Sequence, residues 1–359
     1  MTTVQSTVHG GKHVVIIGGG IAGLAAALRV QALNSVHRVT IVDSVSRLGG
    51  KIAGEIVGGC VVDGGADVCI GGKLRATRLF ADLGLGDRVI AVNPNALPTY
   101  EWRDGQLQRL PASFDGELLT FRQGMQELVD TVCEGLHDVT VVTDTAVNSV
   151  TNESGRWQVD AVGGASYIAD AVIIATPASV AAALLAIISP DTTNGLTALQ
   201  YPPTTTVTMA WNVADVPRPL DGTGYLVTDE TARFSACTWT SSKTPSHAAS
   251  GIALLRGYVR GVAGDAAALM HDEVATVLGI TSLPRFTRIY EWPAGIPIYT
   301  PEYSAIIADL TDRLKAVPGI FIAGSAFHGV GIPDCITSGE RAAAAAVSYF
   351  AASNTGGVA

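Results

Sequence analysis

Charged side chains are scarce in this sequence. Asp, Glu, Lys and Arg together make up 15% of its 359 residues, whereas hydrophobic residues make up 48%. A chain of this length and composition can bury enough apolar surface for two domains, or for one large domain with an insertion. Lys and Arg form no block, and the formal net charge is −9. The sequence therefore argues against nucleic acid and against anionic membranes as partners.

Cysteines and long apolar runs are also few. The five cysteines are scattered and form no CxxC pair, which favours a reduced, cytoplasmic protein. The longest apolar stretch, residues 168–190, contains Asp170 and Pro177, and it predicts a strand, a turn and a helix rather than a membrane span. The apolar run after Lys12 is interrupted by glycines and lacks the cleavage region of a signal peptide. We expect a soluble protein with no membrane partner and, because no ligand spacing of His or Cys is present, no metal.

Glycine, by contrast, is abundant, with forty residues. Gly18, Gly20 and Gly23 have the GxGxxG spacing and lie between a predicted strand and a predicted helix in "KHVVIIGGGIAGLAAALRVQAL". The first glycine permits a tight turn, the second lets the backbone approach a pyrophosphate, and the third lets helix and strand pack closely. A second predicted strand, "HRVTIVD", ends in Asp43, 20 residues after Gly23, where a carboxylate binds ribose hydroxyls. The pattern predicts a Rossmann-type dinucleotide site with the phosphates at the helix N-terminus.

Two further glycine turns distinguish between the dinucleotides. "SRLGGK" (46–51) follows the ribose acid directly, and "VVDGGADV" (61–68) brings another turn after a short predicted strand. A second close backbone approach so soon suits a longer cofactor that lies across the domain. The sequence therefore favours FAD over NAD.

These segments, together with "AGSAFHGVGIPDCITSGERAA" near the C-terminus, resemble the flavin amine oxidase superfamily, and within it protoporphyrinogen oxidases most closely. The resemblance runs from about Lys12 to Tyr349. It implies non-covalently bound FAD, with the following residues as cofactor contacts: Gly18, Gly19, Gly20, Ile21, Ala22, Gly23, Asp43, Ser44, Arg47, Gly49, Gly50, Lys51, Gly65, Ala66, Asp67, Val147, Gly324, Val330, Gly331, Ile332, Pro333 and Asp334.

The resemblance also gives a role to the irregular turn before the alanine-rich C-terminal helix. Pro333 suits the first turn of a helix, where its missing N–H costs nothing. In the family, this helix N-terminus points at the part of the flavin ring that becomes negative on reduction. A partly buried helix end stabilises an adjacent anion by about 0.3–2 kcal/mol.

Three features depart from the family pattern. Ser325 stands where many amine oxidases have an acid that meets the ribityl chain, and the strand predicted within 201–211 lacks the lysine that many of them use near flavin N5. Full-length protoporphyrinogen oxidases insert a long helical segment that walls the substrate cavity. Here a few residues separate "LQRLPASF" (107–114) from "FRQGMQELVDTV" (121–132). The fold of the family therefore carries over, whereas its porphyrinogen substrate does not.

We predict an α/β fold in which a Rossmann-type FAD-binding domain is interleaved with a smaller α+β substrate domain. The sequence predicts a helix over 73–85, a hairpin that turns at Asp104–Gly105, and a mostly antiparallel sheet between Tyr201 and Trp292 that forms the floor of the substrate pocket. The predicted boundaries are 11–75, 121–180 and 315–353 for the FAD-binding domain, and 76–120 and 181–314 for the substrate domain.

Hydride transfer to flavin needs little acid–base help, because the protein mainly orients the reactants and excludes water. His328 is the candidate catalytic residue, since it directly precedes the predicted flavin turn and can titrate near neutrality. The other six histidines show no ligand spacing and are expected at the surface. Candidates for the substrate pocket are the aromatic residues Tyr100, Trp239, Trp292 and Tyr299.

We expect an FAD-dependent oxidoreductase that oxidises a small or medium organic substrate by hydride transfer to flavin, with O2 as electron acceptor, as a biosynthetic tailoring enzyme. Two alternatives remain open. One is a redox-neutral isomerase or cyclase that takes and returns a hydride. The other is a flavin-binding subunit whose pocket a partner chain, or a second copy of this chain, completes.

The purified protein should be yellow, and mild denaturation should release FAD into solution. The physical reason is that no family cysteine for covalent attachment is evident, although Cys335 lies in the predicted flavin segment. Absorbance spectra of the supernatant after heat precipitation measure the release. Colour that stays with the denatured chain would contradict non-covalent binding.

Overall fold

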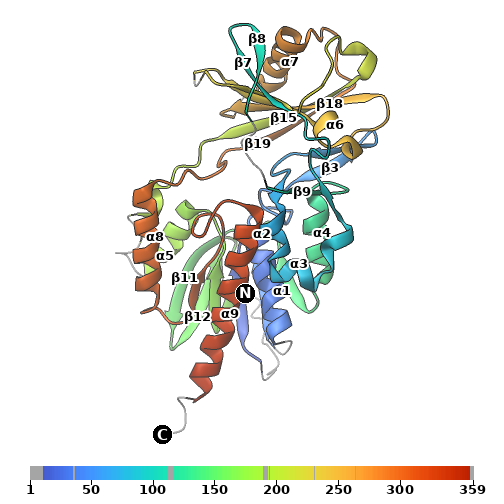
Figure 1. Cartoon of the computed structure of the whole chain (residues 1–359). Coiled ribbons are helices and arrows are strands. Elements are labelled where there is room, and N and C mark those ends of the chain that lie inside the picture. The colour runs from blue at the N-terminus through green and yellow to red at the C-terminus, as the bar shows by residue number, and fades with distance from the viewer. Residues whose placement is uncertain are drawn as a thin grey trace. The chain divides into compact units, whose positions relative to one another are not determined.

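The computed structural model describes residues 11–34, 37–111, 116–188, 193, 195–229, 231–262 and 264–355. The chain divides into two compact units that each use several stretches of sequence (Figure 1). Unit 1 comprises Met1–Gly50, Val132–Leu199 and Tyr299–Ala359, and unit 2 comprises Lys51–Thr131 and Gln200–Ile298. Two interleaved α/β units match the predicted fold class. Segments 51–75, 121–131, 181–199 and 299–314 lie in the other unit from the one expected, and the assignment of each unit to cofactor or substrate stays a prediction.

Unit 1 is built on a five-stranded parallel sheet of order β10-β2-β1-β14-β20. Every residue of β1 and β14 is buried, which explains why their sequences, "HVVII" and "AVII", are apolar without alternation apart from His13. The strands are β1 (His13–Ile17), β2 (Arg38–Val42), β10 (Val139–Val142), β14 (Ala171–Ile174) and β20 (Ile320–Ile322).

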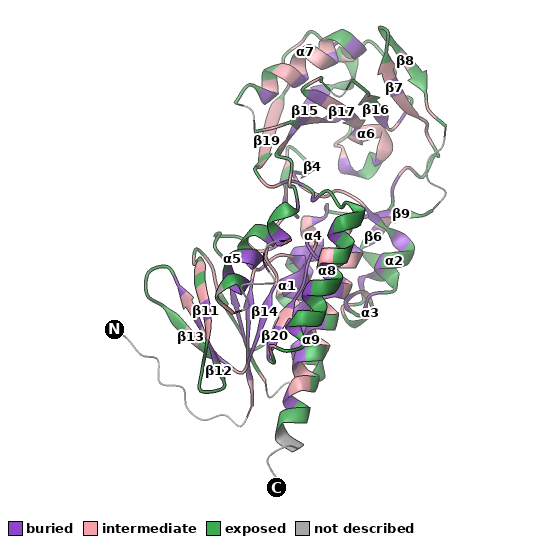
Figure 2. Ribbon diagram, turned by 90° about the vertical axis from the view of Figure 1, so that its left-hand side faces the viewer, coloured by how far each residue is buried: buried purple, intermediate pink, exposed green. Residues whose placement is uncertain are grey.

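Layers on both faces bury this parallel sheet (Figure 2). Helices α1 (Ile21–Leu33) and α9 (Ile332–Thr355) lie on one side, and an antiparallel sheet of β11, β12 and β13 lies on the other. Trp157 of β12 donates its indole N–H to the carbonyl of Pro318, 3.2 Å away, directly before β20. The remaining elements of unit 1 are β11 (Val147–Glu153), β12 (Arg156–Ala161), β13 (Ser166–Ala169), α5 (Ala178–Ile188) and α8 (Pro301–Leu314).

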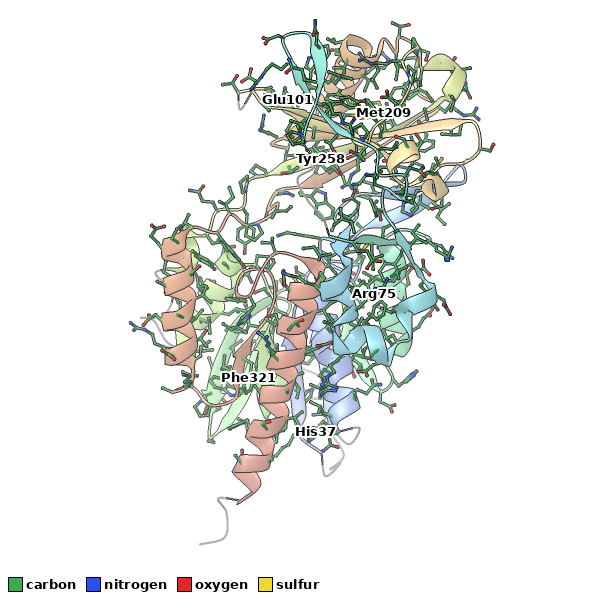
Figure 3. All side chains as sticks on the ribbon, viewed as in Figure 1. His37, Arg75, Glu101, Met209, Tyr258 and Phe321 are labelled. Atoms are coloured by element: carbon green, nitrogen blue, oxygen red, sulfur yellow. The ribbon has the colours of Figure 1, made fainter. Side chains whose placement is uncertain are left out.

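Unit 2 is built on a seven-stranded sheet of order β19-β15-β18-β17-β16-β7-β8, in which only the β16–β7 pair is parallel. The predicted mostly antiparallel sheet is therefore confirmed. Glu101, Met209 and Tyr258 mark it in Figure 3. The strands are β7 (Thr99–Arg103), β8 (Gln106–Arg109), β15 (Thr204–Asn212), β16 (Gly224–Val227), β17 (Phe234–Trp239), β18 (Ile252–Arg260) and β19 (Phe286–Trp292).

The two faces of this sheet differ in chemistry. Helix α7 (Ala266–Leu278) packs on one face, where it forms an apolar core with residues such as Met209, Trp211 and Leu255. The alternate residues of β15 and β18 include Thr206, Thr208 and Arg256, all buried. One face of the sheet is therefore an apolar core, and the other carries buried polar groups.

Shorter elements complete the chain. The predicted hairpin is confirmed, with Asp104 and Gly105 both at positive φ in its turn. The single helix expected over 73–85 is wrong, because Thr77 donates to Leu74 O and caps a new helix by accepting the N–H of Phe80. The elements are β3 (Gly54–Val57), β4 (Cys60–Asp63), β5 (Cys69–Ile70), α2 (Gly71–Arg75), α3 (Arg78–Asp82), β6 (Val89–Ala91), β9 (Leu118–Phe121), α4 (Gln126–Gly135) and α6 (Thr240–Lys243).

Among the residues that the structure describes, no helix is both long enough and apolar enough to cross a membrane.

Replacing Gly339 by Ala should destabilise unit 1, although alanine normally stabilises a helix interior by about 1 kcal/mol relative to glycine. A Cβ at Gly339 of α9 would lie 2.0 Å from the carbonyl oxygen of Ala22 in α1, so the helices would have to separate. Such overpacking costs about 1–3 kcal/mol. Urea denaturation measures the change. The control is Ala345→Gly at an exposed position of α9, which should follow helix propensity alone. A Gly339→Ala variant more stable than the wild type would contradict the close approach of α1 and α9.

Candidate cofactor site

At Gly18 and Gly23, the glycine turn between β1 and α1 leaves no room for a side chain. Gly18 has φ +106°, and a Cβ there would lie 2.5 Å from Ala175 O. A Cβ at Gly23 would lie 1.9 Å from Gly18 O, whereas one at Gly20 would meet nothing nearer than 3.8 Å. The first and third glycines are thus required by the turn itself. The turn does not require the second, since a Cβ there would make only an ordinary contact with Gly50, and a glycine at this position suits the backbone approach of a pyrophosphate.

The N-terminus of α1 is ready to accept an anion. Its cap residue, Gly20, has no side chain, and no side-chain hydrogen bond caps the helix. The first N–H groups of α1 therefore have no acceptor from a capping side chain and carry the positive end of the helix dipole. A diphosphate fits this arrangement.

A second glycine turn lies against the first. Gly49 donates its N–H to Gly19 O at 2.8 Å, and Gly50 has φ +59°, so that a Cβ on Gly50 would lie 3.0 Å from the Cα of Gly20. Arg47 donates to Gly50 O at 2.6 Å and so fixes this loop. The segment "SRLGGK" therefore lies against the first glycine turn, and its predicted approach to the cofactor stays a prediction.

Asp43 follows β2 and contacts the nucleotide turn. Its Oδ2 accepts the N–H of Gly19 at 2.5 Å, and its Oδ1 accepts the N–H of Val45 at 2.9 Å. Each carboxylate oxygen has a second lone pair for a ribose hydroxyl. The two backbone bonds hold the carboxylate in place, and its role toward ribose stays a prediction. Ser44, beside it, is exposed.

The irregular turn before α9 is held by side chains of unit 1. Gly324 has φ +109° and donates its N–H to Ser338 Oγ at 3.0 Å. The hydroxyl of Tyr299 accepts the N–H of Gly329 at 3.1 Å and donates to Ser325 O. The hydroxyl of Tyr303 also donates to Ala326 O at 2.9 Å, so three hydroxyls from outside the turn fix its shape.

Helix α9 begins at Ile332, and Pro333 lies in its first turn as predicted. The side chain of Asp334 lies close to the preceding glycines: a Cβ at Gly329 or Gly331 would come within 2.9 or 2.8 Å of it. These glycines therefore make room for Asp334. Val330 is exposed next to them.

His328 lies in this turn, with Nδ1 2.9 Å from Ser338 Oγ. Burial and, to a lesser extent, Arg341 lower the pKa of His328. Its neutral form is therefore favoured at neutral pH, which suits a proton acceptor better than a proton donor. Its catalytic role stays a prediction.

In unit 2, the turn after β4 uses its own backbone N–H groups internally. Ala53 O accepts the N–H groups of Gly64 at 2.7 Å and Gly65 at 3.3 Å, and Lys51 O accepts that of Ala66 at 3.2 Å. Gly65 and Ala66 can therefore contact a cofactor by packing rather than by donating these N–H groups. The ammonium of Lys51 lies 4.7 Å from the centroid of the Tyr201 ring.

Charged side chains gather around a cavity next to this turn. Asp67 pairs with Lys243 at 3.3 Å and with Arg256 at 3.6 Å. Burial opposes ionisation of Asp67, but the two cations outweigh it and lower its pKa. The cavity is small, with a volume of about 20 Å³ open to water. Its lining includes Asp63, Thr208 and His247. About one or two waters fill such a volume.

Of the aromatic candidates for the substrate pocket, some hydrogen-bond to a turn and others pack in or against the apolar core of unit 2. Trp292 donates its indole N–H to Gly64 O at 3.0 Å, and Tyr299 braces the turn before α9 as described above. Trp239 is fully buried in the apolar core with α7, and the ring of Tyr100 lies 5.8 Å from it. None of these positions tests a substrate contact, which stays a prediction. Val147, the predicted adenine contact, opens β11 and is half-buried.

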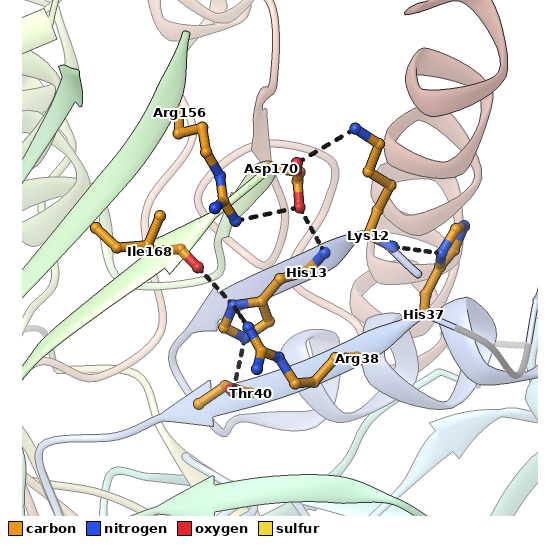
Figure 4. Close-up of polar contacts among 8 residues, drawn as sticks. All are labelled: Lys12, His13, His37, Arg38, Thr40, Arg156, Ile168 and Asp170. Carbon is orange, nitrogen blue, oxygen red and sulfur yellow. Dashed lines mark hydrogen bonds and ion pairs between the residues drawn. The ribbon is translucent and has the colours of Figure 1, made fainter. Parts of the chain in front are cut away.

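A separate polar cluster lies at the amino end of β1, away from the glycine turn (Figure 4). Asp170 accepts the N–H of His13 at 2.8 Å and pairs with Lys12 at 3.4 Å and Arg156 at 3.6 Å. His13 Nδ1 lies 2.6 Å from Ile168 O, and burial lowers the pKa of His13 to about 4. The cluster ties strand ends together and uses a neutral histidine.

The expectation of surface histidines is therefore wrong for two residues. His13 is 6% and His247 is 3% exposed, because each directs ring nitrogens to buried polar groups, such as Phe121 O at 2.9 Å from His247 Nε2. His9 lies outside the described residues.

Sequence reasoning missed Arg256, Lys243 and Ser338. A signal existed for the first: Arg256 interrupts the apolar strand "IALLRGYV", where a charge must have a buried partner. Lys243 and Ser338 lie in segments of ordinary composition, and nothing in the sequence indicates their contacts.

The fold and the glycine turns define a Rossmann-type dinucleotide-binding protein, and the uncapped helix N-terminus fits the diphosphate of FAD. A model of the family "flavin containing amine oxidoreductase" matches residues 21–116 and 108–347. The chain belongs to this family. It is an FAD-dependent oxidase or dehydrogenase, as the sequence motifs predicted.

Individual relatives are distant. Coproporphyrinogen III oxidase of Bacillus subtilis is 24% identical over 468 aligned positions, which cover 95% of this chain and 99% of the relative. A crystal structure from Exiguobacterium sp. 255-15, to which protoporphyrinogen oxidase activity is attributed, superposes with a TM-score of 0.82 at 20% identity and covers 95% of this chain and 99% of its own. Cyclohexylamine oxidase from Brevibacterium oxydans superposes with a TM-score of 0.75 at 13% identity, over 95% and 100% of the two chains. The structural matches confirm the fold.

Replacing Asp63 by Asn should make the stability of the protein less dependent on pH. Burial raises the pKa of Asp63 to about 7, against the N–H of Met125 and the charge of Arg256, which lower it. A raised pKa means that this stability contribution is complete below the unfolded pKa, near 4, and is lost as pH rises through about 7. The loss is on the order of a few kcal/mol. Asn cannot ionise but still accepts the Met125 N–H, 2.8 Å away in the wild type.

Denaturant unfolding at pH 5 and at pH 8 gives the two free energies to compare. Asp82→Asn, at an exposed position of the same unit, is the control and should unfold with the pH dependence of the wild type. Equal pH dependence in the wild type and Asp63→Asn would show that Asp63 is ionised normally in the folded protein.

Proposed function

We propose that this protein oxidises a small or medium organic substrate by hydride transfer to FAD and acts as a biosynthetic tailoring enzyme. The observation that carries the proposal is the uncapped N-terminus of α1 behind a turn without side chains, in a chain of the flavin containing amine oxidoreductase family. Bound FAD supplies the chemistry by accepting a hydride at its flavin ring.

The residues of the chain divide the remaining work. Gly20 and the α1 N-terminus bind the diphosphate, and Asp43 orients the ribose. The N-terminus of α9 provides positive potential to an adjacent anion. His328, neutral at neutral pH, can take up a proton at Nε2 because its Nδ1 contacts Ser338.

The size of the substrate follows from the shortened connection between β8 and β9. β8 ends at Arg109 and β9 begins at Leu118, so the connection is too short for a long helical segment. The Bacillus relative aligns over 468 positions, which exceeds this chain's 359 residues, so it contains stretches without a counterpart here. Residues 112–115 of the connection lie outside the described residues. A shorter wall favours a substrate smaller than a tetrapyrrole.

Two further proposals concern the setting of the reaction. We propose O2 as the acceptor that reoxidises the flavin, and the cytoplasm as the compartment, since the five scattered cysteines suit a reducing environment. Anaerobic mixing with candidate substrates separates the reaction types. Lasting loss of flavin absorbance indicates net oxidation, and transient loss indicates an isomerase. Loss that requires a second protein indicates a subunit.

The isolated protein should be an inefficient protoporphyrinogen oxidase. A substrate must be held within about 3–3.5 Å of its reaction partner and kept dry for hydride transfer. Without the helical walls, a large macrocycle loses buried apolar contact at about 25 cal/mol per Å². Anaerobic stopped-flow absorbance with protoporphyrinogen and with coproporphyrinogen measures flavin reduction. Rapid reduction by either would restore the porphyrinogen oxidase function of the relatives and overturn the proposal of a smaller substrate.

A further inference from the structure

The turn at Gly64 and Gly65 is fixed from the side of the seven-stranded sheet. Gly64 O accepts hydrogen bonds from Thr206 Oγ1 at 2.6 Å, Trp292 Nε1 at 3.0 Å and Arg256 Nη2 at 3.3 Å. The same Nη2 donates to Gly65 O. Side chains of β15, β18 and β19 therefore hold both carbonyls.

At Gly64 and Gly65 the turn has no room for a side chain. A Cβ at Gly64 would lie 2.3 Å from the ring of Tyr290, and one at Gly65 would lie 1.9 Å from Lys51 O. Because the N–H groups of the turn are also bonded within unit 2, each peptide plane is held at both ends. The sheet side chains and the backbone acceptors of unit 2 therefore fix the orientation of both peptide groups in the turn.

Arg256 is the charged member of this set, and it is 4% exposed. Besides the two carbonyls, it faces Asp67, whose Oδ2 lies 3.6 Å from Nη1. Its Nε and Nη1 make no hydrogen bond within the described part of the chain, and the residue lines the cavity that has room for water. A water between Nη1 and Asp67 would satisfy both groups.

The charges around the cavity leave a positive balance near neutral pH. Arg256 and Lys243 are cations, and Asp67 is ionised because both cations stabilise it. Asp63 has its pKa raised to about 7 by burial, so it is partly protonated. A positive charge held in a poorly hydrated region acts on an adjacent anion more strongly than one in water.

We propose that Arg256 is a positioning residue for the flavin: it fixes the Gly64–Asp67 turn from behind and directs positive potential through it toward the reduced ring. This inference rests on the proposed function and on the predicted contact of Gly65, Ala66 and Asp67 with FAD. The guanidinium can serve both purposes because its planar set of donors reaches two carbonyls and a carboxylate at once. Lysine, with one ammonium, can supply the charge but not this geometry.

Three variants test the proposal. Arg256→Met removes charge and donors at similar length, Arg256→Lys keeps the charge, and Arg260→Met is the control on the same strand, where Arg260 is exposed and bonds to Asp229 O. The measurements are FAD affinity of the apoprotein by fluorescence titration, the flavin midpoint potential by dye equilibration, and the melting temperature without FAD.

Arg256→Met should weaken FAD binding about 10- to 100-fold, as expected for losing hydrogen bonds to a charged group, and should make the midpoint potential more negative. Arg256→Lys should restore the potential while FAD binding stays weakened. Arg260→Met should match the wild type in both. A purely structural role would lower the melting temperature and leave the potential of the bound flavin unchanged.

Wild-type FAD affinity and potential in a folded Arg256→Met variant would overturn the inference. If that variant does not fold, Arg256→Lys decides: wild-type affinity would overturn the positioning role, and weakened affinity with a preserved potential would support it. If the wild-type chain binds no FAD, the proposed function itself is wrong. That result differs from the results that would overturn only the role of Arg256.

Discussion

Helix α1 lies against neighbouring backbone with no side chain between them, and much of unit 1 depends on this close packing. Gly23 lets α1 approach the turn at Gly18, and Gly339 lets α9 approach the carbonyl of Ala22. Gly324, at the end of β20, comes within the same region, since a Cβ there would lie 3.7 Å from the Cβ of Ala22. The first and last segments of the described chain therefore meet at the N-terminal turn of α1. The position of the uncapped N-terminus of α1, the predicted diphosphate site, follows from these contacts.

Unit 2 also contains a glycine turn packed closely against its neighbours, but polar side chains hold this turn in place. Gly64 and Gly65 again exclude side chains from a turn, but here three side-chain donors, from Thr206, Trp292 and Arg256, bond to the Gly64 carbonyl behind it. Glycines make the approach sterically feasible, and polar side chains on the sheet fix its geometry. A buried arginine is costly unless its donors are used. Its presence on an otherwise apolar strand is therefore a sign that the position of this turn matters.

Local patterns in the sequence predicted the elements that local forces decide. The buried strand and helix around Gly18, the Asp104–Gly105 turn and the first turn of α9 with Pro333 all follow from residue conformations within a few positions. The break at Thr77 was missed because a side chain that bonds to its own backbone competes with helix continuation, and residue composition does not show which wins. His13 was missed because its ring is buried between distant partners, the carbonyl of Ile168 and the hydroxyl of Thr40. The same distinction applies to the site residues. The roles of Gly18, Gly20 and Gly23 can be predicted from their spacing. Arg256, by contrast, bonds to residues about 190 positions earlier in the chain, and these contacts form only when the sheet of unit 2 has folded.

The same separation bears on the proposed function, in which the chain binds FAD but encloses a substrate smaller than a tetrapyrrole. The contacts that fix the Gly64–Asp67 turn come from β15, β18, β19 and α6, and those that fix the turn before α9 come from Tyr299 and Ser338. None of these contacts comes from the connection between β8 and β9, where the full-length relatives of the resemblance have their insert. Changing the length of that connection alters what can be enclosed and leaves these hydrogen bonds in place. In the proposed function, substrate size and FAD binding thus depend on different segments of the chain, so a change in one would not require a change in the other.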